Sequence, residues 1–297
     1  MADKLLPDLL FRTIAHFVPE ALHEHILVVG SLAAAYYHRE QLTDRGVNTK
    51  DADIVIQPAG AISESRAVAE GLLAHGWQRH EKCFAKPVPE HPLQAIRLWP
   101  PESRAFFFEL LAFPPAEQTE SLQWLPVQLN DGWYGLPSFR FLGLTNFGKA
   151  TSEHGIRYAV PAMMALANLL SHRRVGPELM SEAIGGRTLR RSAKDLGRVL
   201  ALAWLAGRDE TEAWSVSWRT ALLARFPEEA NELAAGAGDG LRQLLGDSSS
   251  LDEAHHAANI GLLAGKGLLP DQLRAVGLQL LADALEPLAR DLQPARG

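Results

Sequence analysis

The chain has 297 residues, which at roughly 100 to 200 residues per domain is enough for two domains. Hydrophobic residues make up 47% and charged residues 22%, as in ordinary globular proteins, and the net charge of −6 argues against a protein that coats nucleic acid with its whole surface. A single cysteine, Cys83, excludes an intrachain disulfide and favours a reducing cytoplasm.

The N-terminal segment 3–24 is predicted to form an amphipathic helix, because Leu5, Leu9, Ile14, Phe17 and Leu22 recur near helical spacing. Its acidic residues, histidines and proline exclude a secretory signal peptide. No run in the chain approaches the roughly 20 apolar residues of a membrane span. We therefore expect a soluble cytoplasmic protein without a membrane partner.

The next segments alternate between strand and helix. The run "ILVV" (26–29) predicts a short buried strand, and "SLAAAYYHRE" (31–40) predicts a helix. "DADIVIQP" (51–58) predicts a second strand that Pro58 stops, and "SRAVAEGLLAHGW" (65–77) predicts a helix closed by Gly76.

Strand-like runs then follow at 93–99, 105–113 and 125–129, separated by turn signals such as Asn130-Asp131-Gly132. After Pro161 almost every segment is rich in Leu and Ala and has a helical pattern. The sequence therefore predicts an α/β (α+β) domain with a small mixed sheet over residues 1–160, and an all-α helical domain over 161–297.

Two aspartates at the start of the second strand are candidate metal ligands. Side chains alternate across a strand, so Asp51 and Asp53 share one face while Ala52 and Ile54 point into the packing. Two like charges on one face repel unless a cation lies between them, and Mg²⁺ prefers oxygen ligands. A solvated strand edge gives the same short pattern, so the surrounding residues decide between the two interpretations.

Those surroundings add a phosphate-binding turn and a third carboxylate. Gly30 and Ser31 open the first predicted helix of this region, where backbone N–H groups and a hydroxyl can bind phosphate. Glu109 is the one charge in the apolar run "AFFFELLAF", so it needs either a partner or the polar face of an edge strand. The whole combination, in this order, favours a site for a metal and a triphosphate.

A basic stretch lies between residues 172 and 198, with seven basic and three acidic residues in an acidic protein. Such a local excess is typical of a surface that contacts phosphate or RNA. A solvated helix face is the alternative for its outer arginines.

The segments "VVGSLAAAYYH" and "NTKDADIVI" resemble, in this order, the first two motifs of the nucleotidyltransferase fold, the polymerase-beta-like superfamily. Within it they are similar to the abortive-infection-type nucleotidyltransferases, many of which are toxins of bacterial toxin–antitoxin systems. A later family motif, in which a proline and a helix precede an arginine and a Lys-Asp pair, is matched by Pro161, Arg173 or Arg174, Lys194 and Asp195.

The resemblance implies a Mg²⁺- or Mn²⁺-dependent transfer of a nucleoside monophosphate from an NTP to an acceptor. Asp51 and Asp53 would hold the metal on the triphosphate. Either Glu109 or Asp195 would act as base for the acceptor hydroxyl, and Lys194 would stabilise charge on the phosphates. The resemblance assigns nucleotide binding to Gly30, Ser31, Thr49, Lys50 and Arg174.

Two positions depart from the family pattern. Asn168 stands where the family usually has a lysine, and Val47 stands where it often has an arginine. Both favour an alternative in which the chain is a catalytically degenerate nucleotidyltransferase-fold module that binds nucleotide or a partner protein. The presence of both Asp51 and Asp53 favours an active enzyme, and a purely structural helical adaptor is a third alternative.

The acceptor can be tRNA, a protein or a small molecule, and the net acidity favours a small or localised one. The likeness to toxins also implies a bacterial protein with an antitoxin protein as partner.

Overall fold

The computed structural model describes residues 5–42, 46–47, 49, 51–80, 85–87, 92–101, 104 and 106–292. Lys50 and Cys83 lie outside the described residues. The chain divides into two compact units. The first, here called the sheet unit, comprises Met1–Arg39 and Asp44–Val160, and the second, the helical unit, comprises Glu40–Thr43 and Pro161–Gly297.

The helices of the sheet unit have different bounds from those that the sequence pattern predicts. They are α1 (Pro7–Phe17), η1 (Glu20–His25), α2 (Gly30–Tyr37), α3 (Ile62–Ala74) and η2 (Arg140–Asn146), of which η1 and η2 are 3₁₀-helices. The prediction of a single helix over 3–24 is wrong at the C-terminal end, because α1 ends at Phe17. Val18 is extended, at φ −95° and ψ 128°, because Pro19 disfavours the helical conformation in the residue before it.

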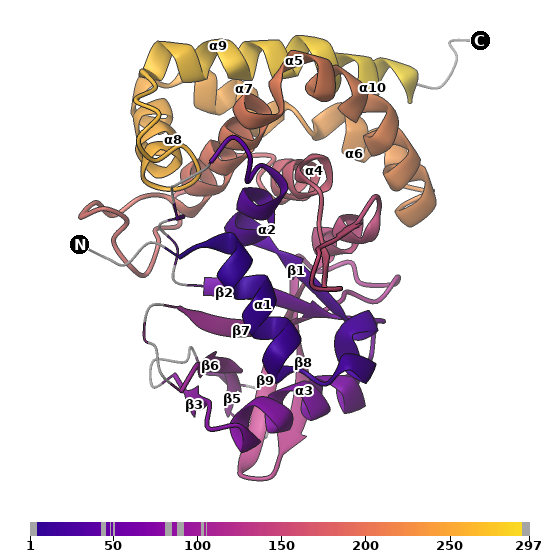
Figure 1. Ribbon diagram of the computed structural model, residues 1–297. Coiled ribbons are helices and arrows are strands. Elements are labelled where there is room, and N and C mark those ends of the chain that lie inside the picture. Colours follow the sequence, from indigo (N-terminus) through magenta and orange to yellow (C-terminus); the bar gives the residue numbers. More distant parts are fainter. Residues whose placement is uncertain are drawn as a thin grey trace. The chain divides into compact units, whose positions relative to one another are not determined.

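The main sheet is mixed, as the sequence predicts. Among the described residues it has the order β10-β11-β1-β2-β7-β6-β3. Figure 1 labels five of these strands, β1, β2, β7, β6 and β3. Strand β2 runs antiparallel to β1 and parallel to β7, and β1 runs parallel to β11. Its strands are β1 (Ile26–Val29), β2 (Asp51–Ile56), β3 (Gln78–Arg79), β6 (Arg97–Trp99), β7 (Phe107–Ala112), β10 (Ala150–Thr151) and β11 (Arg157–Tyr158).

A smaller sheet has the order β4-β5-β9-β8 within the described residues. Its strands are β4 (Ala85–Pro87), β5 (Pro92–Ala95), β9 (Gly132–Phe139) and β8 (Leu122–Leu129). The strand predicted for 93–99 is interrupted at Ile96, so that β5 and β6 belong to different sheets. Strand β9 was not predicted, because Gly135 and Pro137 lower its strand propensity. A Cβ atom at Gly135 would lie 2.6 Å from the Trp124 ring, so the glycine makes room for that indole.

The helical unit contains α4 (Pro161–Ser171), α5 (Arg191–Arg225), α6 (Ala230–Gly236), α7 (Asp239–Gly246), α8 (Ser248–Ile260), α9 (Pro270–Leu280), the π-helix η3 (Leu281–Leu285) and α10 (Glu286–Asp291). The helical C-terminal half expected from the sequence is confirmed. Gly207 has φ 74° and ψ 178°, so α5 is two helices joined at a kink.

Close contacts hold α5 against its neighbours in the helical unit. A Cβ atom at Gly197 would lie 2.5 Å from the carbonyl oxygen of Ala254, so glycine lets the backbones of α5 and α8 approach. Trp218 is fully buried and donates its indole N–H to the carbonyl oxygen of Ala162 over 2.8 Å. The long helix is therefore joined to both α8 and α4.

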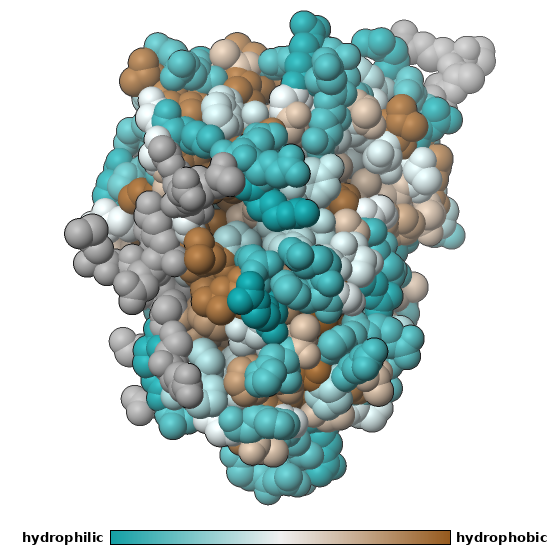
Figure 2. Space-filling model, viewed as in Figure 1, coloured by the Kyte–Doolittle hydropathy of each residue, from teal (hydrophilic) through white to brown (hydrophobic). Residues whose placement is uncertain are grey.

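On the face shown in Figure 2 hydrophilic residues predominate, and apolar residues form small groups. The most exposed large apolar side chains of the described residues include Leu179, Val216 and Leu269. None of the described helices combines the length and the apolar character that crossing a bilayer requires.

Candidate functional site

The turn between β1 and α2 brings backbone against a carboxylate. Gly30, the first residue of α2, has φ +77°, a conformation that glycine adopts at little cost. A Cβ atom at this position would lie 2.6 Å from Oδ2 of Asp53. Only glycine therefore satisfies both the backbone conformation and the contact. The register explains the proximity, because Val29 is the partner of Asp53 between β1 and β2.

The two aspartates of β2 occupy the partly exposed face of the strand. Asp51 and Asp53 are half-buried, whereas Ala52 and Ile54 are fully buried on the other face. The hydroxyl of Thr49 donates to Oδ1 of Asp51 over 2.5 Å, so Thr49 fixes the orientation of the Asp51 side chain. Two carboxylates thus lie on one face of the strand beside the start of α2.

Glu109 joins this face from the next strand. In the parallel pairing of β2 and β7, Glu109 is the register partner of Asp53, so their side chains project from the same side of the sheet. Asp51, Asp53 and Glu109 therefore form a carboxylate group along two adjacent strands. The sequence suggested that they belong together but could not supply the register that makes them neighbours.

The charge of Glu109 has a partner on a third strand. Arg97 lies opposite Glu109 in the antiparallel pairing of β6 and β7 and donates to both carboxylate oxygens, at 3.0 Å each. The two side chains are only 16% and 13% exposed. The expectation that Glu109 has a partner is confirmed. Arg97 itself was missed, although one charge in the run "LQAIRLW" is the signal that could have found it.

Ser31 lies in the first turn of α2 and is half-exposed. Its hydroxyl belongs to the same turn as Gly30, as predicted from the Gly-Ser pair. Lys50, which the resemblance assigned to nucleotide binding, lies outside the described residues.

The candidate residues after Pro161 belong to the helical unit. Asp195 in α5 accepts a hydrogen bond from His172 (Nε2 to Oδ2, 2.9 Å), with Lys194 and Arg198 at 3.8 and 3.9 Å. Burial raises the pKa of Asp195, but the charge of Lys194, the hydrogen bond from His172 and the charge of Arg198 outweigh it and hold the pKa well below its usual range. Asp195 is therefore ionised and embedded in basic groups.

Most arginines of the basic stretch are paired with acidic residues of the helical unit. Arg187 pairs with Asp252 at 2.8 Å, and Arg190 pairs with Glu253 at 2.9 Å. Arg174, a predicted nucleotide-binding residue, is exposed on the segment that follows α4. The excess positive charge that the sequence suggested is thus partly balanced by acidic residues from α8.

The two positions that depart from the family pattern have different environments. Val47 is 3% exposed and pairs with Leu5 in a β-bridge, so it is part of the core of the sheet unit. Asn168 is half-buried in α4, between residues that are buried. An arginine at position 47 would need a different local packing to reach a phosphate.

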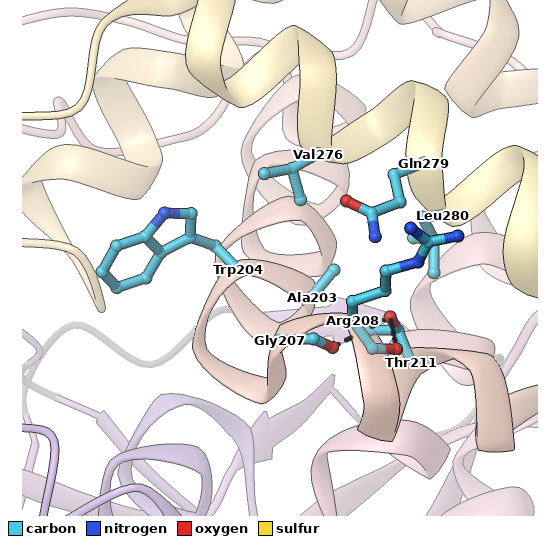
Figure 3. A pocket seen from close by; sticks show the side chains of 8 residues that line it. All are labelled: Ala203, Trp204, Gly207, Arg208, Thr211, Val276, Gln279 and Leu280. Carbon is cyan, nitrogen blue, oxygen red and sulfur yellow. Dashed lines mark hydrogen bonds between the residues drawn. The ribbon is translucent and has the colours of Figure 1, made fainter.

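A cavity of about 150 Å³ lies in the helical unit, and it is lined by residues other than the predicted site residues (Figure 3). Trp204 and Arg208 line it from α5, and Val276 and Gln279 line it from α9. Beside it, the Thr211 hydroxyl lies 2.9 Å from the carbonyl oxygens of Gly207 and Arg208, at the kink of α5. The kink therefore opens a small, mixed-polarity hollow against α9.

No family model matches the chain, and no curated protein matches it. JHP933 from Helicobacter pylori is similar with a TM-score of 0.36 and 12% identity, covering 97% of this chain and 94% of that chain. An antigenic nucleotidyltransferase-like protein from Paracoccidioides brasiliensis is similar with a TM-score of 0.32 and 14% identity, covering 78% of this chain and 94% of that chain. These scores are too low to assign a fold family, so the chemistry of the site has to be inferred from its own residues.

Proposed function

We propose that the chain is a Mg²⁺-dependent nucleotidyltransferase, which transfers a nucleoside monophosphate from an NTP to an acceptor. One observation carries this proposal: the glycine that opens α2 lies against the carboxylate of Asp53. A triphosphate bound at the start of the helix would therefore meet the carboxylates directly.

The donor set fits a hard divalent cation. Asp51 and Asp53 offer oxygen atoms from one face of β2, and Mg²⁺ is typically bound by one or two carboxylates together with phosphate oxygens. The absence of a side chain at Gly30 lets the backbone at the start of α2 lie against the Asp53 carboxylate. When bound, the ion would neutralise charge on the phosphates and orient the leaving pyrophosphate.

The other residues of this site would bind the phosphates or orient the carboxylates. The first N–H groups of α2 and the hydroxyl of Ser31 would bind phosphate oxygens at the positive end of the helix. Thr49 holds Asp51 in one orientation through its short hydrogen bond. Arg97 orients Glu109 by donating to both of its carboxylate oxygens, so that this side chain is in place before substrate arrives.

We assign the third-carboxylate role to Glu109 rather than Asp195. Glu109 is the register neighbour of Asp53, and its side chain projects from the same side of the sheet as the two aspartates of β2. The roles that the resemblance implies for Lys194, Asp195 and Arg174 stay predictions, as does the identity of the acceptor among tRNA, a protein and a small molecule.

Calorimetric titration with each NTP in the presence of Mg²⁺ tests the site. We expect the wild type to bind at least one NTP, and Asp53→Asn to weaken that binding at least about tenfold, a loss of 1.4 kcal/mol. Glu117→Gln, an exposed acidic residue changed in the same way, is the matched control and should bind as the wild type does. Equal affinities for wild type and Asp53→Asn would overturn the assignment.

A second candidate function is a degenerate module that binds nucleotide without transferring it. The burial of Val47, where the family often has an arginine, favours it. Incubating the protein with α-labelled NTP and a bacterial extract separates the two. Label that moves to an RNA, protein or small-molecule fraction shows transfer, whereas NTP binding without any labelled product supports the module.

A toxin role with an antitoxin partner rests on the resemblance alone. We expect overexpression in bacteria to arrest growth and Asp53→Asn to relieve the arrest at equal protein level. Unchanged growth with abundant, folded wild-type protein would contradict the toxin role but would not bear on the proposed nucleotide site.

A further inference from the structure

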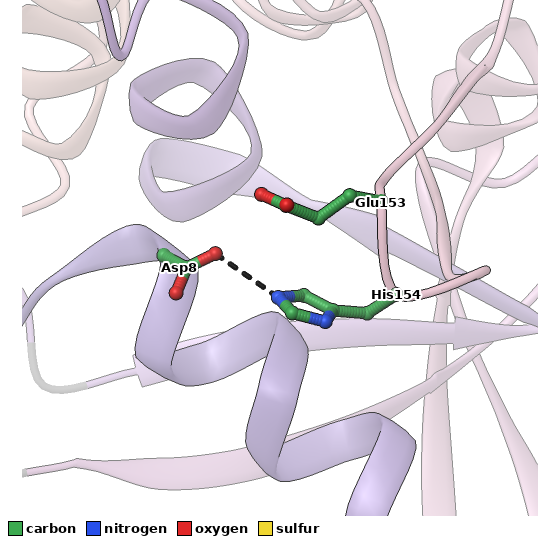
Figure 4. Close-up of side chains that lie close together, drawn as sticks. All are labelled: Asp8, Glu153 and His154. Atoms are coloured by element: carbon green, nitrogen blue, oxygen red, sulfur yellow. Dashed lines mark hydrogen bonds and ion pairs between the residues drawn. The ribbon is translucent and has the colours of Figure 1, made fainter.

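A second group of metal-ligating side chains lies in the sheet unit, apart from the carboxylates of β2 and β7. Asp8 projects from the first turn of α1, and Glu153 and His154 project from the turn between β10 and β11 (Figure 4). One ligand atom from each of the three lies within 4.8 Å of the others. Residues from opposite ends of the sheet unit's sequence thus converge at one point.

The contact between Asp8 and His154 already has the spacing of two ligands on one ion. Nε2 of His154 lies 3.0 Å from Oδ1 of Asp8. Two atoms at this separation can both lie at roughly 2.1 Å from a single ion and subtend roughly 90° there. Arg12 binds the other oxygen, Oδ2, at 2.6 Å, which orients the carboxylate with Oδ1 toward His154.

The turn that carries Glu153 and His154 is held by hydrogen bonds. The amide of Gly155 donates to the carbonyl oxygen of Ser152 over 3.0 Å, and the amide of Ile156 donates to the Ser152 hydroxyl over 3.2 Å. The Tyr36 hydroxyl accepts from the amide of Glu153 at 3.3 Å and lies 3.4 Å from its Oε1. Asp8 and His154 are half-buried, and only Glu153 is exposed.

We propose that Asp8, Glu153 and His154 form a binding site for a first-row transition-metal ion such as Zn²⁺, which joins α1 to the β10–β11 turn. Two carboxylates and one imidazole give three protein ligands, which leaves further coordination positions to water. The imidazole selects against Mg²⁺, which prefers an all-oxygen environment, and favours Zn²⁺ and its neighbours. Glu153, the exposed member of the group, would supply the third ligand atom.

Titration with Zn²⁺ tests the site, on tag-free protein and with excess Mg²⁺ present to occupy carboxylate-only sites. We expect one Zn²⁺ per chain and a rise in melting temperature on binding, because an ion that binds only the folded state stabilises it. His154→Ala and Glu153→Gln should each weaken the affinity at least about tenfold. Circular dichroism checks that each variant is folded.

His16→Ala is the matched control, because His16 is an exposed histidine on the same helix as Asp8. It should bind Zn²⁺ as the wild type does. Asp53→Asn separates this site from the nucleotide site, because it should leave the Zn²⁺ affinity unchanged. Absence of binding to folded wild type, or equal affinity in His154→Ala, would show that Asp8 and His154 form only a structural hydrogen bond, and loss of binding in Asp53→Asn would place the ion at β2.

Discussion

The Cβ position of Gly30 lies 2.6 Å from Oδ2 of Asp53, closer than side-chain carbon atoms are found in folded proteins. This contact ties the conformation of the β1–α2 turn to the position of one carboxylate. Any side chain added at the turn therefore has to displace that carboxylate.

Gly30→Ala should both destabilise the fold and weaken NTP binding. The left-handed conformation of an alanine costs about 1–2 kcal/mol, and the clash with Asp53 adds to this. Gly60→Ala is the matched control, because Gly60 also has φ +77° but a Cβ atom there would meet nothing within 4 Å among the described residues. Thermal unfolding and NTP titration compare the two. Equal losses of stability in both variants would contradict the role of the contact.

Arg97→Met should destabilise the sheet unit by about 3–5 kcal/mol, because it removes the cation whose Nη2 group donates to both oxygens of the largely buried Glu109 carboxylate. The double variant Arg97→Met, Glu109→Leu should recover most of that loss, since neither charge remains buried. Urea unfolding of the wild type, the single variant and the double variant measures this. A double variant as unstable as Arg97→Met would show that packing, rather than charge, sets the loss.

His38 should make the protein less stable as the pH falls from about 6.5 to 4. The side chain is 3% exposed, Nε2 accepts or donates no hydrogen bond within the described part of the chain, and burial lowers the pKa to about 4. The unfolded chain, with a histidine pKa near 6.5, binds the proton first, so protonation favours unfolding. At about 1.4 kcal/mol for each pKa unit between the two states, the loss by pH 4 is roughly 3 kcal/mol.

Denaturant unfolding across that pH range, on wild type and His38→Gln, measures the effect. The variant should lose most of the slope of stability against pH between 6.5 and 4. His16→Gln, at an exposed histidine, should keep the slope of the wild type. An unchanged slope in His38→Gln would assign the pH dependence to other groups.

Trp218→Phe should cost the helical unit more stability than Trp214→Phe. Both indoles are buried, at 0% and 2% exposure, and their ring centroids lie 5.6 Å apart. Trp218 donates to the carbonyl oxygen of Ala162, whereas Nε1 of Trp214 has no hydrogen-bond partner among the described residues. Losing a buried hydrogen bond costs about 1–3 kcal/mol. Thermal unfolding of both variants gives the comparison, and a larger loss in Trp214→Phe would contradict it.

Local patterns were enough to predict the strand and helix around Gly30 and the shared face of Asp51 and Asp53. They follow from alternation along one strand and from one glycine before a helix. The mixed sheet and the helical second half also follow from the local patterns. The limits of the first helix were not predicted correctly, because the apolar pattern continued past Pro19 to Leu22.

Long-range pairings were out of reach of the sequence. Arg97 meets Glu109 only because β6 lies beside β7, and Asp8 meets His154 only because α1 approaches the β10–β11 turn. Strand β9 was missed because Gly135 lowers its strand propensity, whereas in the fold this glycine makes room for the Trp124 ring. The roles of the site residues stay predictions for the same reason, since chemistry depends on groups that the chain brings together from a distance.

The two edges of β1 are filled at very different times during synthesis. Strand β2 follows soon after β1 and can pair with it early, but the other edge is filled by β11, at Arg157 and Tyr158. A nascent chain shorter than this exposes one open edge of a fully apolar strand, which is a template for wrong pairing. Because chains emerge at about 5–20 residues per second, that edge waits for several seconds. Nascent chains that are truncated before Arg157 and remain bound to the ribosome should therefore need protection by a chaperone. Longer nascent chains should not need it.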